Sequence, residues 1–161
     1  MDEETEANMY EWIVAYLQKE GFHQYEVSNF ACGNHESMHN KAYWNYYDFY
    51  GIGCGASGKI NHVRYDAPHT LSMYLQDSLY KEKTVLTKED EMFEMLMMGL
   101  RLIKGMNLAL FEKRFGVSFM DVFGEKAKKQ LQEGFVEIKD GYFRCTETGY
   151  EIMNTILVEL M

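Results

Sequence analysis

The chain has 161 residues, which is enough for one domain or for one domain and part of another. Its net charge of −9 argues against a nucleic-acid-binding surface, because phosphate recognition needs clustered Lys and Arg side chains. Apolar residues make up 47% of the sequence, yet no apolar run approaches the roughly 20 residues that a membrane span requires. The three cysteines are widely spaced and odd in number, which favours reduced thiols over a disulfide framework.

The first predicted element is an amphipathic helix. Residues 2–6 are acidic, which suits a helix N-terminus. A signal peptide would begin with basic residues instead, so we expect a cytoplasmic protein without a membrane span. The apolar positions at helical spacing are Met9, Ile13, Tyr16 and Leu17. Gly21 ends this helix and a strand over Tyr25–Phe30 follows, an order typical of a parallel sheet.

The next segment is unusually rich in rings and then in glycine. After a polar loop over residues 31–38, residues 39–50 combine a His-Asn pair with six aromatic side chains, and residues 51–58 read Gly-x-Gly-x-Gly-Ala-x-Gly. Flat rings and closely approaching backbone suit a planar ligand, although aromatic side chains in such number also fill cores. We expect a short helix that begins near Asn40, and then a buried strand over Phe49–Ala56 that its glycines weaken.

Two further short elements complete the first part of the chain. Lys59–Asp66 alternates between apolar and polar residues, as a short extended piece or hairpin arm does. His69-Thr70 opens a helix whose apolar positions are Leu71, Tyr74, Leu75 and Leu79. We place a domain boundary near residues 83–87, which divides the chain into residues 1–85 and 86–161.

The second part begins with a helix. Thr87 with Asp90 forms a variant of the capping box. The predicted apolar face consists of Phe93, Leu96, Met97 and Leu100. The methionines clustered nearby are typical of an adaptable core rather than of a cofactor site.

The tail has the pattern of a winged helix. Two helices end at Gly116 and Gly134, two short strands flank Asp140-Gly141, and Thr146 caps a last helix. Such a tail raises the possibility of DNA binding through Lys126, Lys128 and Lys129. Because acidic residues balance these lysines, we interpret them as a solvated helix face and expect no nucleic-acid partner.

Several segments together resemble a known family. They are Tyr25–Ala31, His39–Trp44, Tyr50–Gly58, and Gly99–Leu102 with Gly105. They are similar to the oxygen-independent coproporphyrinogen III oxidases and their haem-chaperone relatives, HemW, over nearly the whole chain. This resemblance implies a mixed α+β or α/β fold: terminal β/α elements of a partial radical-SAM barrel in residues 1–85, then a helical, winged-helix-like C-terminal domain in residues 86–161.

The resemblance also implies a function. The full-length parent binds a [4Fe–4S] cluster and S-adenosylmethionine, and it either hands haem to acceptor proteins or decarboxylates coproporphyrinogen III. The His-Asn-x-x-Tyr-Trp spelling favours the haem-chaperone branch. This chain lacks the Cys-x-x-x-Cys-x-x-Cys cluster motif, so we expect it to need the missing N-terminal barrel and to be inactive as an enzyme alone. The alternative from another class is a non-catalytic interaction module that dimerises through exposed strand edges.

The candidate cofactor-binding residues are His39, Asn40, Tyr43, Trp44, Gly53, Gly55 and Ala56. His39 is the predicted ligand of haem iron, and Tyr43 and Trp44 are predicted to stack on a porphyrin face. The alternative is that His39 hydrogen-bonds a carbonyl and the rings fill a core; Met38 and His35 are weaker candidate ligands. We predict no catalytic residue. Ser57 stands where family members often carry His, and a serine cannot replace an imidazole as ligand or proton carrier.

Overall fold

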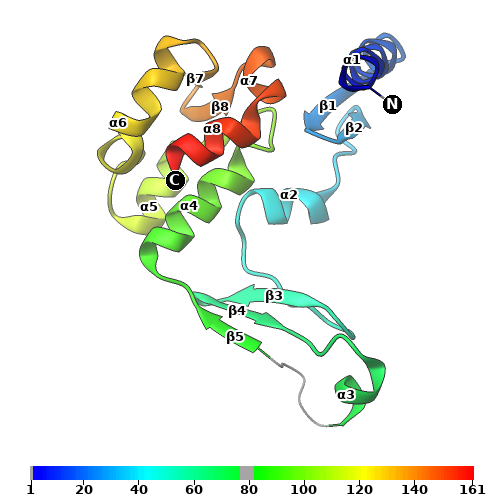
Figure 1. Ribbon diagram of the computed structural model, residues 1–161, viewed down its shortest axis with the longest axis vertical. Helices are drawn as coiled ribbons and strands as arrows, with labels where there is room; N and C mark the ends of the chain where they lie inside the picture. Colours follow the sequence, from blue (N-terminus) through cyan, green and yellow to red (C-terminus); the bar gives the residue numbers. More distant parts are fainter. Residues whose placement is uncertain (1, 77–81) are drawn as a thin grey trace.

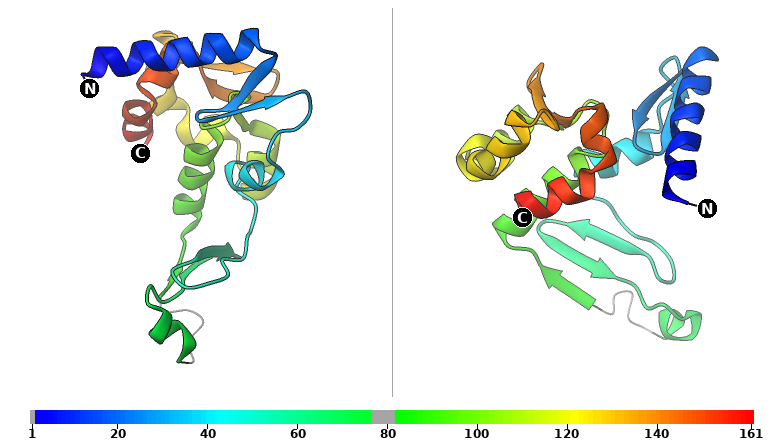
Figure 2. Two further views of the ribbon diagram at one scale, coloured as in Figure 1. Left: turned by 90° about the vertical axis from the view of Figure 1, so that its right-hand side faces the viewer. Right: turned by 45° about the horizontal axis from the view of Figure 1, so that its top comes forward.

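The structure, a computed structural model, describes residues 2–76 and 82–161. Figure 1 shows three parts. Helix α1 and a two-stranded hairpin lie beside the larger C-terminal part, and a three-stranded sheet extends away from both along the long axis (Figures 1 and 2). Helix α2 lies between these parts, and it carries most of the residues of the candidate site.

The N-terminal part is a helix packed on a hairpin. Helix α1 (Glu3–Lys19) begins where the Asp2 carboxylate accepts from Thr5 N, and Gly21 follows it with a φ of +83°. Strand β1 (Phe22–Glu26) pairs antiparallel with β2 (Asn29–Cys32). The prediction of one strand over Tyr25–Phe30 in a parallel sheet is therefore wrong. The chain reverses there because the buried Glu26 carboxylate accepts hydrogen bonds from Ser28 N, at 3.0 Å, and from the Asn29 amide.

Backbone hydrogen bonds join this hairpin to the segment that follows α4. Val27 N donates to Arg101 O at 3.0 Å, and Ile103 N donates to Tyr25 O at 3.1 Å. An isolated bridge pairs Glu26 with Leu102 between them. The N-terminal part is thus attached to the C-terminal part through main-chain groups, which do not depend on side-chain identity.

The segment after α2 differs from its prediction. Helix α2 (Met38–Trp44) begins where Ser37 Oγ accepts from Asn40 N, as expected for a short helix near Asn40. No strand covers residues 49–56; a single bridge pairs Phe49 with Lys59. Gly53 and Gly55 have φ values of +118° and +72°, so the backbone turns where an extended strand would need negative φ.

The extended pieces that follow form the separate sheet. Its strands are β3 (Ser57–Ile60), β4 (Val63–Asp66) and β5 (Glu82–Val85), which are antiparallel in the order β3-β4-β5. The single extended piece or hairpin arm predicted over residues 59–66 is instead parts of two strands, because the chain reverses at Asn61 and His62 between β3 and β4. Strand β5 was not predicted. Thr70 caps α3 (Leu71–Leu75) as expected, and Leu79 lies outside the described residues.

The C-terminal part consists of helices around a small antiparallel sheet in the order β6-β8-β7. Its elements are α4 (Lys88–Gly99), β6 (Met106–Asn107), α5 (Leu108–Phe115), α6 (Phe119–Gln132), β7 (Val136–Lys139), β8 (Tyr142–Cys145), α7 (Glu147–Glu151) and α8 (Met153–Leu160). The Thr87–Asp90 capping box and the 136–145 hairpin are confirmed. The prediction of a single last helix is wrong, because the helix is interrupted at Ile152 between α7 and α8.

This part contains the main hydrophobic core. The rings of Phe111, Phe119 and Phe143 are fully buried, and Phe119 and Phe143 have centroids 4.5 Å apart. Met92, Met95 and Met106 are also buried in this core, which confirms the interpretation of the methionine cluster as packing. The predicted apolar face of α4 is confirmed at Leu96 and Leu100, which are completely buried. Met92 and Met95 are also buried whereas Phe93 and Met97 are half-buried, so the face is rotated slightly from the predicted one.

The buried thiol of Cys145 gives a first prediction. Burial raises its pKa from 9.0 to about 12, whereas Cys32 and Cys54 are exposed. We expect Ellman's reagent at pH 8 to titrate these two exposed thiols in the native chain, and Cys145 only after denaturation, because the thiolate is the reacting species. Rapid reaction of the Cys32→Ser/Cys54→Ser variant under native conditions would contradict the packing described for β8.

The same thiol should make unfolding depend on alkaline pH. Above pH 9.0 the unfolded thiol ionises while the folded one keeps its proton up to about 12, so stability falls as pH rises through this interval. The slope of the unfolding free energy against pH should be smaller for Cys145→Ala than for the parent chain. Equal slopes would show that ionisation of this thiol does not contribute.

Candidate functional site

One face of α2 presents an exposed histidine. His39 and Tyr43 are four positions apart, so they lie on the same side of the helix. Their rings meet edge to face with centroids 4.8 Å apart, and Tyr43 meets Phe49 in the same way at 4.4 Å. The His39 side chain is exposed and forms no hydrogen bond with the residues that the structure describes. The alternative that His39 hydrogen-bonds a carbonyl is therefore not met among the described residues.

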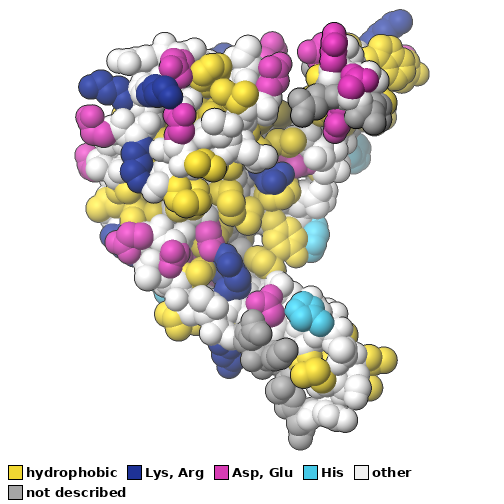
Figure 3. Space-filling view, in the orientation of Figure 1, with side chains coloured by type: hydrophobic (Ala, Val, Ile, Leu, Met, Phe, Trp, Pro, Cys, Tyr) yellow, Lys and Arg dark blue, Asp and Glu magenta, His cyan; other side chains and the backbone are white. Residues whose placement is uncertain are grey.

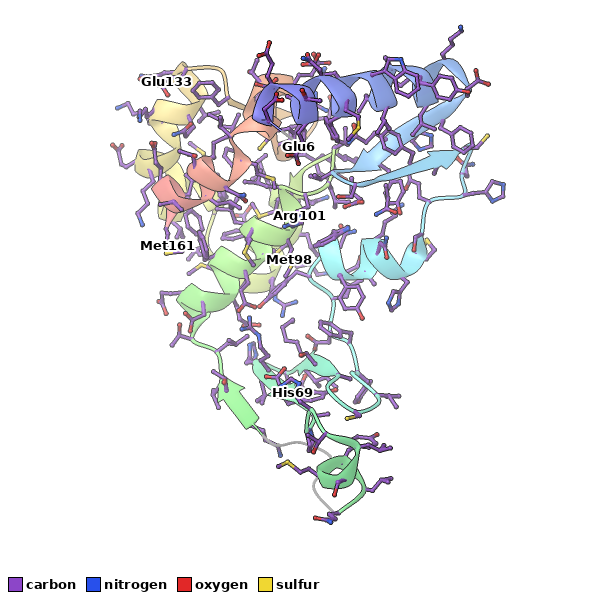
Figure 4. All side chains as sticks on the ribbon, turned by 45° about the vertical axis from the view of Figure 1, so that its right-hand side comes forward. Glu6, His69, Met98, Arg101, Glu133 and Met161 are labelled. Atoms are coloured by element: carbon purple, nitrogen blue, oxygen red, sulfur yellow. The ribbon has the colours of Figure 1, made fainter. Side chains whose placement is uncertain are left out.

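The neighbouring face of α2 points into the protein. Trp44 is half-buried and lies under the Arg101 guanidinium, whose carbon is 5.2 Å from the ring centroid. Figure 4 labels Arg101 next to α2. The Trp44 indole nitrogen is buried without a partner among the described residues. It is Tyr43, and not Trp44, that lies in ring contact with the exposed imidazole.

A narrow void adjoins the packed tryptophan. Its volume is about 10 Å³, close to the smallest that holds one water molecule. The lining residues are Trp44, Asn45, Met95, Gly99, Gly105, Met106, Asn107 and Leu110. A tetrapyrrole is far too large for this space.

The glycine segment packs against its own sheet. Gly55 N donates to Pro68 O at 2.8 Å, and Ala56 O accepts from Ala67 N at the same distance. Ala56 N donates to Gly53 O at 3.2 Å. These groups are occupied within the segment, and in the described part of the chain no hydrogen bond or ring contact joins Gly53, Gly55 or Ala56 to His39. The hydrogen bonds of the described residues thus link Gly55 and Ala56 to residues 67–68 and not to α2.

A buried polar cluster around Tyr46 was not predicted. The Tyr46 hydroxyl donates to Glu94 at 2.7 Å, and burial together with this carboxylate raises the pKa of the phenol. Two cations lie over its ring: Lys59 Nζ at 3.9 Å and the Arg114 guanidinium carbon at 4.9 Å. Lys59 is only 3% exposed and is neutralised by Asp48 at 2.8 Å. Sequence patterns gave no signal for this cluster, since its members are scattered over residues 46–114.

The donor set for metals is sparse. Among residues 2–76 and 82–161, no three His, Cys, Asp or Glu side chains are grouped as a metal site requires. Cys145 is buried in the C-terminal core, away from the exposed Cys32 and Cys54. These residues do not fit a [4Fe–4S] cluster, which needs converging thiolates. In the same part of the chain, no helix is long and apolar enough to cross a membrane.

Comparisons with known proteins agree on one group. Residues 86–152 match the HemN C-terminal domain. Over 99% of its length, the chain is 32% identical to the haem chaperone HemW of Lactococcus lactis, and it covers 43% of that protein. It is 33% identical to the mitochondrial radical S-adenosyl methionine domain-containing protein 1 of Bos taurus, with 99% of this chain and 40% of that protein covered.

A solved structure shows the same fold. Coproporphyrinogen III oxidase (HemN) from Escherichia coli, described as a radical SAM enzyme, superposes with a TM-score of 0.75 at 16% identity. The alignment covers 99% of this chain and 42% of that one. Residues 86–152 therefore form a HemN C-terminal domain. The chain is a homologue of the haem chaperone HemW and of radical S-adenosyl methionine domain-containing protein 1, and it spans about two fifths of the length of these relatives.

The two tryptophans of the chain give a matched pair of variants. Trp44→Ala should lower the free energy of unfolding by about 3 kcal/mol, because it empties the contact between α2 and the C-terminal part. Trp12→Ala removes a ring that is 63% exposed and should change it by less than about 1 kcal/mol. Urea unfolding followed by far-UV circular dichroism measures both, and equal losses would show that Trp44 does not anchor α2.

Proposed function

We propose that this chain is the C-terminal part of a radical-SAM haem chaperone and that it binds haem as cargo through His39. The observation that carries the proposal is the exposed imidazole of His39 within the His-Asn-x-x-Tyr-Trp segment. The relatives named haem chaperone HemW support the choice of cargo. The solved HemN structure supports the fold but, at 16% identity, gives no reason to prefer coproporphyrinogen decarboxylation.

The residues of α2 have different roles in the proposed haem binding. A neutral imidazole donates its nitrogen lone pair to haem iron, and in this proposal His39 supplies that ligand from the surface. The Tyr43 ring supports the imidazole at its edge and offers apolar contact to the porphyrin. Asn40 and Trp44 serve mainly to seat the helix, although Asn40 remains a candidate contact. Figure 3 shows histidine side chains at the molecular surface on this side, where an acceptor protein could reach the cargo.

The parent protein supplies what this chain lacks. We propose that residues 1–85 complete a radical-SAM barrel and that residues 86–161 form a winged-helix-like domain, in a cytoplasmic protein. The [4Fe–4S] cluster and the S-adenosylmethionine are then bound by another segment of the parent protein. Gly53, Gly55 and Ala56 stay candidates for contact with a cofactor held there, through the side of the loop that does not face residues 67–68.

The proposed ligand is tested by haem titration. His39→Ala should lose most of the Soret absorbance that the parent chain retains after gel filtration, because the iron loses its protein ligand. His35→Ala tests the weaker candidate ligand, an exposed histidine four residues away on the preceding loop, and should retain the Soret absorbance. Undiminished Soret absorbance in His39→Ala would remove His39 from the site.

An exposed apolar stripe on α1 supports a macromolecular partner. Met9, Trp12 and Tyr16 are 46%, 63% and 48% exposed, and the two rings stack with centroids 5.2 Å apart. Hydrophobic side chains are visible at the far end of α1 in Figure 3. We propose that the missing barrel covers this stripe in the parent. Exposed strand edges of the hairpin and of β5 would pair in the same complex.

Without that partner the chain should self-associate. Light scattering at high protein concentration should give the mass of a dimer, and Trp12→Ser/Tyr16→Ser should shift the mass toward the monomer, because the stripe then loses its large apolar rings. A strictly monomeric mass for the parent chain at every concentration would contradict this expectation.

A further inference from the structure

A carboxylate on the loop before α2 joins two elements. Glu36 Oε1 lies 3.0 Å from His23 Nε2 on β1, and Glu36 Oε2 accepts from Lys41 Nζ on α2 at 2.5 Å. The Glu36 side chain is 26% exposed, so water screens this pair of contacts only in part. The hydrogen bonds from Lys41 and then from His23 lower the pKa of the Glu36 carboxyl, which therefore stays ionised at neutral pH.

Helix α2 is consequently fixed at both ends. Its C-terminal end is seated by Trp44 under Arg101, on the C-terminal part of the protein. Its N-terminal end is tied to the N-terminal hairpin by Glu36, and Ser37 Oγ caps the first turn at Asn40 N. His39 lies between these anchors, in the first turn, and among the described residues its side chain makes a ring contact with Tyr43 and no hydrogen bond.

We propose that Glu36 is the positioning residue of the haem ligand, which rests on the proposed function of His39. Glu36 does not touch the cargo in this proposal; it holds the first turn of α2 so that the imidazole stays beside Tyr43. A helix of seven residues is not stable by itself, so its first turn depends on such contacts. When the turn opens part of the time, the apparent affinity falls by the fraction of molecules in which His39 is presented.

The carboxylate has a second effect on the same turn. Glu36 holds the Lys41 ammonium, two residues from His39, at the side of the hairpin. It also engages the ring nitrogen of His23, which is 47% exposed and would otherwise be a free imidazole. Loss of the Glu36 charge therefore releases the Lys41 ammonium and the His23 imidazole, which can compete for the iron. It also loosens the first turn that carries His39. Both consequences should change the spectrum of bound haem as well as its affinity.

The test compares Glu36→Gln with the parent chain by titration with ferric haem. We expect about a tenfold weaker apparent affinity for haem and a shifted or broadened Soret band, because the first turn of α2 is then formed in only a fraction of the molecules. Glu112→Gln is the matched control. Glu112 is an exposed carboxylate on α5, so its substitution removes the same charge from another surface of the protein. An unchanged affinity and Soret band in Glu36→Gln would overturn the proposal.

Two further variants separate positioning from general loss of structure. Lys41→Gln breaks the α2 contact alone and should weaken haem binding in the same direction, and the exchange Glu36→Lys/Lys41→Glu should restore part of the affinity. If the single variants bind weakly only because they unfold, their urea midpoints fall in parallel and the Soret position of the folded fraction stays unchanged, which counts against positioning.

The outcome for His39→Ala distinguishes the two proposals. Loss of haem in His39→Ala together with unaltered binding by Glu36→Gln leaves the proposed ligand in place and rejects the role of Glu36. Full haem binding by His39→Ala rejects both, because the positioning argument depends on that ligand.

Discussion

The candidate site depends on the packing of the Trp44 ring under the Arg101 guanidinium. A helix as short as α2 gains too few hydrogen bonds to offset the cost of its first turn. It persists because its tryptophan packs against the C-terminal part while Ser37 and Glu36 hold the opposite end. These contacts also set the rotation of the helix about its axis. With Trp44 packed under Arg101, His39 remains exposed and Tyr43 beside it is half-buried.

Local chemistry predicted many of the elements. The capping box at Thr87, the glycine that follows α1 and the Asp140-Gly141 turn act within a few residues of themselves, so their effect is written in the sequence. The two failures differ in cause. The turn between β1 and β2 is local, since the Glu26 carboxylate accepts from Ser28 N and the Asn29 amide, but a glutamate side chain is not among the usual turn signals. The glycine segment depends on a later part of the chain, because it hydrogen-bonds residues 67–68 instead of extending as a strand.

The site was predicted to the same extent. The His-Asn-x-x-Tyr-Trp segment was correctly placed on a short helix, and residues four apart had to share a face. The sequence did not predict which face of α2 would be exposed, since histidine and tryptophan both occur at buried and at exposed positions. Arg101 decides it from a position 57 residues after Trp44. The Tyr46 cluster was equally invisible, because a lysine in a strand pattern gives no sign that it will be buried beside a ring.

The Tyr46 cluster determines where this protein can be cut. Residues 86–152, the portion that matches the HemN C-terminal domain, include Glu91, Glu94 and Arg114. Their partners Tyr46, His62 and Arg64 come from the preceding sequence. A recombinant domain that starts at residue 86 would therefore leave Glu94 without Tyr46 and Arg64, while Glu91 would lose His62 and keep Arg114. The smallest portable unit begins upstream of Tyr46, and chimaeras with relatives have to exchange both halves of this cluster together.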